Sequence, residues 1–456
     1  MRIESINPAD GSVNATIEPI SASQAVEVCR NAHEAFADWK NRSLSERGAY
    51  LKKLAQALRA KKRTYAETMV KEMGKPIAQA ESEVEKSAWT ADVYAENASE
   101  WLKDHEVKAD GQKHVVRFEP LGTVLCIMPW NFPFWQVLRV AIPTLIAGNT
   151  VVLRHSNNVP LCAQALEAAF QDAAFPKDVF SVVVTEHDAA KAMIESRYIQ
   201  GVSLTGSEKA GQIVGAQASA NLKKLVLELG GSDAFIVLED ASLEKAVAAA
   251  VQGRTQNNGQ SCIAAKRFIV HEKIADSFTK KFAEKIASLK VGDPMDPKTQ
   301  IGPLSSFKQR DEVKSQVDDS VAKGAKILCG GNIPHGMEKG AFYAPTVLSE
   351  VTKQMRVWSE EVFGPAAPVM VVFSDEEAIA LANDSELGLG GSVWTEDRER
   401  GEAVAKKIES GAVFVNHVTK SDPRMPFGGI KKSGIGRELG EFGLKEFCNV
   451  KAYNIY

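Results

Sequence analysis

One polar turn carries the residue best suited to covalent chemistry in this chain. Residues 256–264 read Gln-Asn-Asn-Gly-Gln-Ser-Cys-Ile-Ala, so the thiol of Cys262 lies on a glycine-containing turn. An expected helix, 243–252, precedes the turn and an expected strand, 266–270, follows it. Backbone amides of such a turn can point at a reacting carbonyl, which favours Cys262 as a nucleophile. The alternative is a buried structural cysteine, because the turn contains no histidine.

Two further stretches offer groups that such a nucleophile needs. Glu228, in Leu-Glu-Leu-Gly-Gly at 227–231, ends a strongly apolar run, so desolvation should raise its pKa towards that of a general base. Asn131 stands between aromatic residues in Met-Pro-Trp-Asn-Phe-Pro at 128–133, where its amide could donate to an oxyanion. Each has a structural alternative: a buried ion pair for Glu228 and an ordinary turn residue for Asn131.

The segment best suited to bind a phosphate is Leu-Thr-Gly-Ser-Glu, residues 204–208. This segment follows an expected strand, and Thr205 and Glu208 have the spacing of a capping box that opens a helix. Free amides there could meet a phosphate, although a well-capped helix explains the pattern equally well. The nearest match to a GxGxxG fingerprint, residues 434–440, is one residue too long and follows no strand. The acidic loop 360–365 could bind a sugar hydroxyl or face solvent.

From residue 122 onwards, apolar strands alternate with helices. Strands this uniformly apolar are buried on both faces, so the pattern predicts an α/β fold with a parallel, doubly wound sheet. Ligands of such sheets bind at the carboxyl ends of the strands. The expected strands are 122–128, 150–154, 180–185, 200–204, 235–238, 266–270, 369–373, 391–394 and 412–415. The expected helices are 134–147, 161–173, 188–196, 208–218, 273–289, 307–323, 375–383 and 398–409, preceded by 23–40, 44–72 and 77–102. A short β segment at 114–118 and a β-like tail at 450–456 complete the list.

Composition limits the class of protein. With 456 residues the chain is expected to hold two or three domains. Its net charge of −3, without long charged blocks, argues against a nucleic-acid or membrane surface. The first 15 residues lack the apolar core of a secretory signal. Six scattered cysteines without a CxxC pair fit a reducing cytoplasm, and no histidine or cysteine spacing indicates a metal site.

Together these motifs, with the glycine-rich segment 426–438, resemble the NAD(P)-dependent aldehyde dehydrogenase superfamily in order and spacing. The resemblance covers nearly the whole chain, which looks most like the bacterial succinate-semialdehyde dehydrogenases. It implies that Cys262 attacks an aldehyde and that Asn131 and the Cys262 backbone amide hold the oxyanion. After hydride transfer to the coenzyme, Glu228 would activate the water that hydrolyses the thioester. These roles agree with the chemistry read from the residues themselves.

The resemblance also implies an organisation and a set of coenzyme contacts. It places a Rossmann-type cofactor-binding domain at 1–101 and 121–231, and an α/β catalytic domain at 232–430. A small β oligomerisation arm at 102–120 and 431–456 would complete a neighbour's sheet in a homo-oligomer, a dimer or a tetramer. Contacts to NAD or NADP would fall on Met128, Pro129, Trp130, Asn131, Arg154, Ser156, Asn157, Gly206, Ser207, Leu229, Glu361 and Phe363.

The chain departs from the family pattern near the expected adenosine ribose. Arg154 and His155 replace the usual lysine and proline. Asn157 stands where NAD-preferring members often carry a glutamate, so no negative charge there would repel a 2′-phosphate and NADP becomes admissible.

The substrate expectation rests on Arg139, a charge within an apolar helical stretch that needs a partner or a purpose. In succinate-semialdehyde dehydrogenases a matching arginine grips the remote carboxylate, and the alternative is a structural ion pair at a subunit contact. Many such enzymes use a second arginine, and Gln256 stands at its position here. Ser421 or Arg424 could compensate for the missing arginine. Other small aldehydes, such as lactaldehyde or glutarate semialdehyde, remain alternative substrates. A CoA-acylating enzyme is disfavoured by Glu228, and a non-catalytic protein by the three catalytic residues together.

Overall fold

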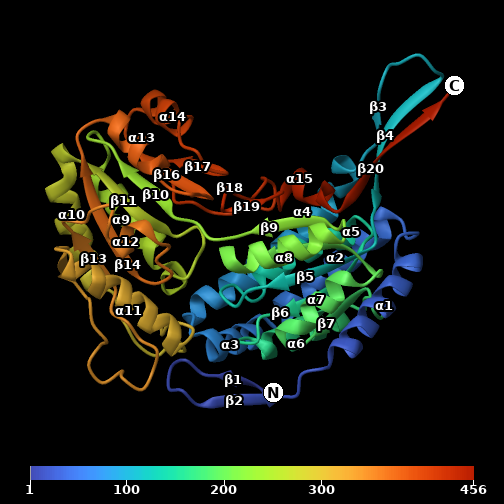
Figure 1. The fold of residues 1–456 in the computed structure, drawn as a ribbon, viewed down its shortest axis with the longest axis horizontal. Coiled ribbons are helices and arrows are strands. Elements are labelled where there is room, and N and C mark those ends of the chain that lie inside the picture. The colour runs from blue at the N-terminus through green and yellow to red at the C-terminus, as the bar shows by residue number, and fades with distance from the viewer. Residues whose placement is uncertain (1) are drawn as a thin grey trace.

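The computed structural model describes residues 2–456 and confirms the predicted α/β fold, which is built on two large sheets (Figure 1). The first sheet has six strands in the order β19-β9-β8-β5-β6-β7. Its long strands are parallel, and only the short β19 runs antiparallel. The strands are β5 (Thr123–Met128), β6 (Thr150–His155), β7 (Phe180–Val183), β8 (Ile199–Thr205), β9 (Lys224–Glu228) and β19 (Gly434–Ile435).

Helices cover both faces of this sheet, as the apolar strands require. Side chains alternate along β5, so Val124 and Cys126 pack into one hydrophobic cluster while Leu125 and Ile127 pack into another. The first cluster is completed by α2 (Leu44–Ala60), α3 (Lys62–Met73), α4 (Ile77–Trp101), α5 (Trp135–Ile146) and α6 (Pro160–Asp172). The second is completed by α1 (Ala22–Trp39), α7 (His187–Glu195) and α8 (Glu208–Ala220).

The second sheet has seven strands in the order β12-β13-β14-β11-β10-β16-β17, and only β12 is antiparallel to its neighbour. Its strands are β10 (Asp233–Val237), β11 (Ala265–His271), β12 (Lys326–Cys329), β13 (Thr346–Ser349), β14 (Ala366–Val372), β16 (Gly390–Trp394) and β17 (Ala412–Val415). One hydrophobic cluster joins it to α9 (Leu243–Thr255) and α10 (Glu272–Ala287). Another joins it to α11 (Phe307–Ala322), α12 (Arg356–Ser359), α13 (Asp375–Asn383) and α14 (Arg398–Ala405).

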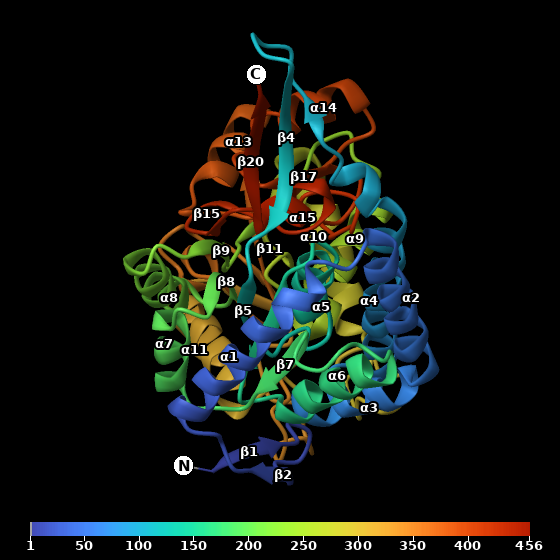
Figure 2. The same cartoon turned by 90° about the vertical axis from the view of Figure 1, so that its right-hand side faces the viewer.

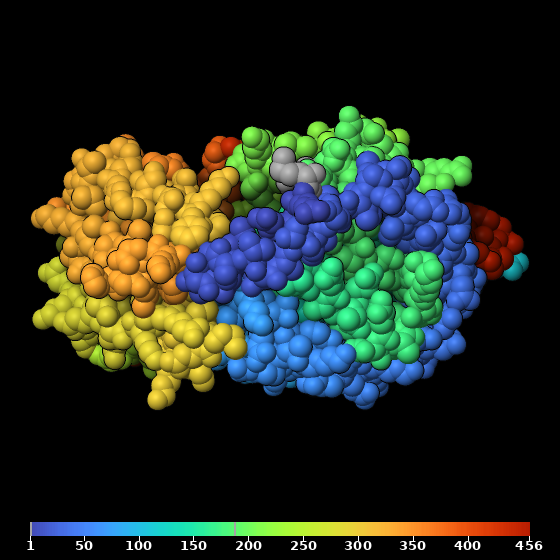
Figure 3. Space-filling model, turned by 90° about the horizontal axis from the view of Figure 1, so that it is seen from below, coloured from blue at the N-terminus to red at the C-terminus, as the bar shows by residue number. Residues whose placement is uncertain are grey.

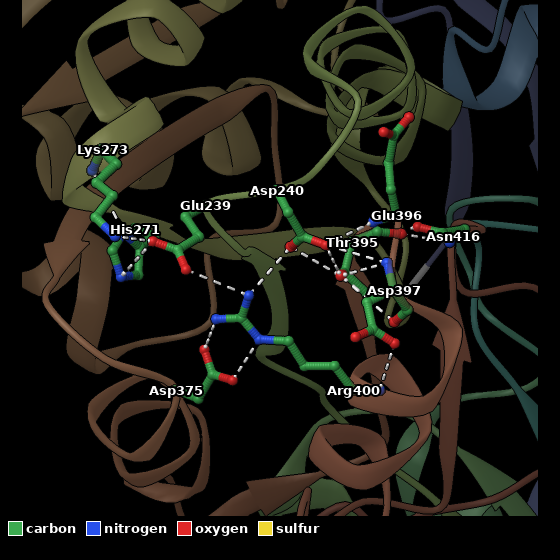
Figure 4. A network of polar contacts seen from close by, with 10 residues as sticks. All are labelled: Glu239, Asp240, His271, Lys273, Asp375, Thr395, Glu396, Asp397, Arg400 and Asn416. Atoms are coloured by element: carbon green, nitrogen blue, oxygen red, sulfur yellow. Dashed lines mark hydrogen bonds and ion pairs between the residues drawn. The ribbon is translucent and has the colours of Figure 1, made fainter.

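A polar network fixes α13 and α14 against the second sheet (Figure 4). The Arg400 guanidinium on α14 donates to both Asp375 carboxylate oxygens, at 2.6 and 2.7 Å, and to Asp240 at 3.3 Å. The Thr395 hydroxyl, just after β16, also donates to Asp240, just after β10. Arg400 is thus paired with carboxylates that follow β10 and open α13, which joins α14 to the sheet and to α13.

Two peripheral elements complete the fold. A three-stranded sheet of β20 (Cys448–Ile455), β4 (Lys113–Pro120) and β3 (His105–Glu106) projects from the body as an arm (Figures 1 and 2). The hairpin of β1 (Ile3–Ile6) and β2 (Val13–Ile17) lies across one face and contacts both halves of the chain (Figure 3). The Ser5 hydroxyl donates to Glu72 of α3, and Pro8 accepts from the Ala341 backbone amide.

Several local expectations were wrong. The predicted helix 44–72 is two helices, because Lys61 leaves the helical conformation at φ −111° and ψ 19°. Thr205 does not cap α8 but ends β8; Ser207 is the cap and accepts from the Ala210 amide at 3.3 Å. The hairpin β1–β2 and strands β12 and β13 were not predicted. The remaining short elements are η1 (Gln256–Gly259), β15 (Leu387–Gly388), β18 (Ile430–Lys431) and α15 (Gly440–Glu446).

Candidate active site

The turn that carries Cys262 is held in an unusual backbone conformation. Helix α9 ends at Thr255, and the next residues form η1, in which Asn257 and Asn258 have φ of 55° and 57° and Gly259 has φ of 77°. Asparagine and glycine tolerate this left-handed region best, which explains the Asn-Asn-Gly sequence. A Cβ at residue 259 would also lie 2.5 Å from the Gly364 carbonyl oxygen. The turn therefore presents Cys262 from a rigid base.

Asn131 is joined directly to this turn. Its side-chain amide donates to the Gln260 carbonyl at 3.2 Å, while the Asn257 amide donates to the Asn131 carbonyl at 2.7 Å. Both asparagines are buried. The fold thus brings Asn131, from the loop after β5, against the turn that carries Cys262.

Glu228 is the last residue of β9 and is buried, as expected. Neither of its carboxylate oxygens has a hydrogen-bond partner among the described residues. Burial, together with the nearby Glu438 carboxylate, raises the pKa of Glu228 well above its ordinary value. The raised pKa makes the Glu228 carboxylate, once it is ionised, a stronger base towards water, so the site fits a general base.

The thiol of Cys262 is protonated in the unliganded site. Burial raises its pKa to about 11, although Arg139 and Lys266 act in the opposite direction. The Lys266 ammonium donates to the Cys262 carbonyl at 2.6 Å and lies 3.0 Å from Glu361. Lys266 was not predicted as a site residue, because it lies within an ordinary apolar strand and only the fold reveals its neighbours.

Two of the expected coenzyme residues, Ser207 and Glu361, line a cavity of about 810 Å³, which Gly230 also borders. The Glu361 carboxylate accepts from the Gly231 amide at 3.1 Å, and a Cβ at residue 230 would lie 2.4 Å from its other oxygen. Phe363 packs edge-on against Trp130 with ring centroids 5.7 Å apart. Gly230 therefore allows the acidic loop to approach the segment after β9 closely.

Other expected coenzyme residues lie at the carboxyl ends of β5, β6, β8 and β9. The Ser156 amide donates to the Met128 carbonyl at 2.9 Å, and Arg154 donates to the Thr185 carbonyl at 3.5 Å. The Asn157 side-chain oxygen is buried without a hydrogen-bond partner among the described residues. Pro129 directly follows Met128 in the loop after β5. The Gly206 amide donates to the Glu228 carbonyl at 2.9 Å, and Leu229, the residue after Glu228, is buried.

His155 contributes a structural contact that the sequence did not indicate. Its Nε2 lies 2.9 Å from the Pro133 carbonyl and its Nδ1 accepts from the Ser156 amide at 2.9 Å. Burial lowers its pKa to about 4, so the ring is neutral at physiological pH. His155 therefore ties the loop that holds Asn131 to the end of β6.

A smaller cavity of about 370 Å³ opens onto Cys262 and will be called the thiol cavity. Arg139 and Ser421 also line it, whereas Asn131, Glu228 and Arg424 are not among its lining residues. Phe132, Trp135 and Phe427 supply aromatic walls. Arg424 lies on the surface and pairs with Asp422 at 2.7 Å, so the structure does not bring it into this cavity.

Arg139 is engaged from several sides. It forms an ion pair with Glu438, its guanidinium carbon lies 4.7 Å from the centre of the Phe427 ring, and it donates to the Thr205 hydroxyl at 3.3 Å. Arg139 therefore faces the thiol cavity and also forms a buried ion pair, which is not the expected pair at a subunit contact. That pair lies within one chain.

Three further observations concern residues 2–456. No group of three or more His, Cys, Asp or Glu side chains there is arranged to hold a metal ion. None of the helices described combines the length and apolar character needed to cross a membrane. All six cysteines are free thiols.

Comparison with known proteins agrees with this geometry. The sequence profile of the aldehyde dehydrogenase family matches residues 1–453. The chain is 46% identical to a succinate semialdehyde dehydrogenase [NAD(P)+] of Escherichia coli, over 98% of this chain and 96% of that one. It is 45% identical to succinate-semialdehyde dehydrogenase [NADP(+)] 1 of Mycobacterium ulcerans, over 99% of each. The structure of succinic semialdehyde dehydrogenase from Streptococcus pyogenes, in complex with NADP+, superposes with a TM-score of 0.96 at 37% identity, over 99% of each chain.

Proposed function

This chain belongs to the aldehyde dehydrogenase family, and we propose that its reaction is the NAD(P)-dependent oxidation of succinate semialdehyde to succinate. The observation that carries the proposal is the thiol cavity, where Cys262 shares a wall with cationic side chains. An aldehyde that bears a second, anionic end fits such a cavity. The relatives from Escherichia coli and Mycobacterium ulcerans, which are named for this substrate, support the choice.

Cys262, Asn131 and Glu228 divide the chemistry between them. The Cys262 thiolate adds to the aldehyde carbon, and the oxyanion that forms is stabilised by the Asn131 amide and the Cys262 backbone amide. A bound nicotinamide coenzyme supplies the hydride acceptor. Glu228 then takes a proton from the water that hydrolyses the thioester, a step for which its raised pKa is suited. A CoA-acylating enzyme has no need of this base.

The expected coenzyme residues fit NAD and NADP. The unpaired Asn157 oxygen is an acceptor for a ribose hydroxyl at the carboxyl end of β6, where α/β sheets bind their ligands. Arg154 supplies positive charge beside it, and Asn157 adds no negative charge that would repel a 2′-phosphate. Glu361 and Phe363 lie close to the Cys262 turn, which places them to hold the nicotinamide end. Relatives named for NAD(P)+ and for NADP+ support both coenzymes.

Domain boundaries, assembly and location belong to the same proposal. The two large sheets support a cofactor domain of residues 1–101 and 121–231 and a catalytic domain of residues 232–430. The projecting sheet supports an oligomerisation arm of residues 102–120 and 431–456. Six free cysteines support a reducing cytoplasm.

One assay tests the proposed reaction. The purified enzyme is incubated with NAD or NADP and either succinate semialdehyde or butanal, an uncharged aldehyde with the same number of carbons, and reduced coenzyme is followed by absorbance. We expect a higher kcat/KM for succinate semialdehyde with either coenzyme, and no turnover by Cys262→Ala. Equal kcat/KM values for the two aldehydes would contradict the substrate, and turnover by Cys262→Ala would contradict the nucleophile.

A further inference from the structure

One face of α4 forms a wall of the thiol cavity. Gln79, Ser82, Glu83 and Lys86 all line this cavity, and their spacing of three and four residues places them on the same side of a helix. The helix reaches the cavity from the first half of the chain, while Cys262 belongs to the second half. Two of these four residues, Glu83 and Lys86, are charged, and their partners differ.

The Glu83 carboxylate is fully occupied. It forms a buried ion pair with Lys75, and its other oxygen accepts from the backbone amides of Phe134 and Trp135 at 2.9 and 3.0 Å. Glu83 therefore holds the start of α5 and forms no ion pair with Lys86.

Arg139 is similarly committed, because Glu438 neutralises it and Phe427 stacks against it. The guanidinium still contributes positive potential to the cavity, but its charge is already balanced. A substrate carboxylate would have to compete with Glu438 for this arginine.

Among the described residues, Lys86 lacks such a partner, as does the more exposed Lys420. Lys86 forms no ion pair with any carboxylate among residues 2–456, and it donates to the Ser421 hydroxyl at 2.6 Å. Its ammonium lies 4.1 Å from the centre of the Trp135 ring, which fixes the side chain over an apolar surface. A half-buried ammonium with one neutral hydrogen-bond partner retains donors for an anion.

We infer that Lys86, oriented by Ser421 and Trp135, binds the carboxylate of the substrate that lies remote from the aldehyde. This inference rests on the proposed function, since it assigns the specificity of the same cavity. Lys86 would supply the positive charge that is missing because Gln256 stands in place of the second arginine. Ser421 would be a second hydrogen-bond donor to the substrate carboxylate. Lys420 also lines the cavity, but it is exposed to solvent and its charge is screened.

The ionisation of Lys86 gives this inference a distinctive pH dependence. Burial and the nearby Arg139 lower its pKa to about 8; Lys420 acts in the same direction, while Glu83 and Asp422 oppose it. The ammonium is thus present below pH 8 and is lost as the pH rises above it. The ratio of kcat/KM for succinate semialdehyde to that for butanal should fall above pH 8. Ionisation of Cys262 and Glu228 affects both substrates and cancels in this ratio.

Substitution of Lys86 separates specificity from structure. Lys86→Met should lower kcat/KM for succinate semialdehyde about 10- to 100-fold, mainly through KM, as expected for loss of a hydrogen bond to a charged group. Butanal oxidation should change less than about threefold. Lys86→Arg should restore most of the preference and make the ratio flat up to pH 10, because arginine stays charged. Ser421→Ala should shift the ratio in the same direction as Lys86→Met, by a smaller factor.

Lys420→Met is the matched control, because it removes a cation from the same cavity and should change the ratio less than about threefold. Equal losses for both aldehydes in Lys86→Met and Ser421→Ala, or a loss of preference only in Lys420→Met, would overturn the inference. Titration calorimetry with succinate provides a readout without turnover. If succinate binds to the wild type but not to folded Lys86→Met, Lys86 is a carboxylate-binding residue even if succinate semialdehyde is not the substrate. Equal binding of succinate to both proteins refutes this role.

Discussion

At the scale of single residues, the two ionisable groups of the proposed mechanism both have raised pKa values, which favour their neutral forms. Burial raises the pKa of Cys262 to about 11 and raises that of Glu228 well above its ordinary value. A neutral Glu228 does not repel a thiolate or an oxyanion. Each group becomes more reactive as the pH rises, so the activity with an uncharged aldehyde should rise from pH 6 to pH 8.

Glu228→Gln should separate acylation from deacylation. The glutamine keeps the shape of the side chain but cannot take a proton from water, so the thioester should form and then hydrolyse slowly. We expect a burst of about one reduced coenzyme per site in stopped-flow absorbance, followed by a steady state at least about 100-fold slower than the wild type. If the burst disappears as well, Glu228 has a role in acylation.

The chemistry of these residues could be predicted from sequence because each stands in a short motif that fits its task. Lys86, Lys266 and His155 could not, since nothing in their local sequence differs from an ordinary helix or strand. Lys86 acquires its meaning only from Ser421, 335 positions away in the chain. Glu438, the partner of Arg139, lies in the glycine-rich segment near the C-terminus. This segment matched a phosphate-binding fingerprint poorly, and its local sequence indicated no other role.

At the scale of elements, α5 is a fully buried helix that carries one charged side chain. All twelve of its residues are buried, and Arg139 is the charged one among them. Its partner Glu438 lies just before α15, on a strand-like segment that pairs with Phe427. Apolar periodicity predicted the helix correctly, but a pattern of residue types cannot identify a partner 299 positions away.

Glu438→Gln should therefore destabilise the fold. The substitution leaves the Arg139 guanidinium buried without its counter-charge, which costs about 3–5 kcal/mol. We expect a clearly lower transition temperature in scanning calorimetry at a fixed scan rate. Glu441→Gln, which breaks the more exposed pair with Lys445, is the matched control and should cost less than about 1 kcal/mol. Similar transition temperatures for the two variants would show that the buried pair is not a major source of stability.

At the scale of the whole molecule, the arm stands out because it buries so little of its own surface. β20 pairs with β4 along its full length, yet seven of its eight residues are exposed. Val450, Tyr453 and Ile455 are 62, 46 and 40% exposed, and β20 forms an outer strand of the three-stranded sheet. An open, apolar edge that projects from the body invites pairing with another chain. Alternating residues in 114–118 and 450–456 predicted the strands, whereas only the structure shows that they leave the body.

Substitution of exposed apolar residues on the arm by lysine should therefore dissociate the oligomer. We expect the wild type to sediment at a mass of at least twice 49.5 kDa, and Val450→Lys/Ile455→Lys to sediment at or near the monomer mass, because charges on an edge strand oppose pairing. Val321→Lys, at an exposed position on α11, is the control and should leave the mass unchanged. The thiol cavity is formed within one chain, so the dissociated variant should keep its preference for succinate semialdehyde over butanal. A monomeric wild type, or a double variant with unchanged mass, would show that this edge is not the assembly surface.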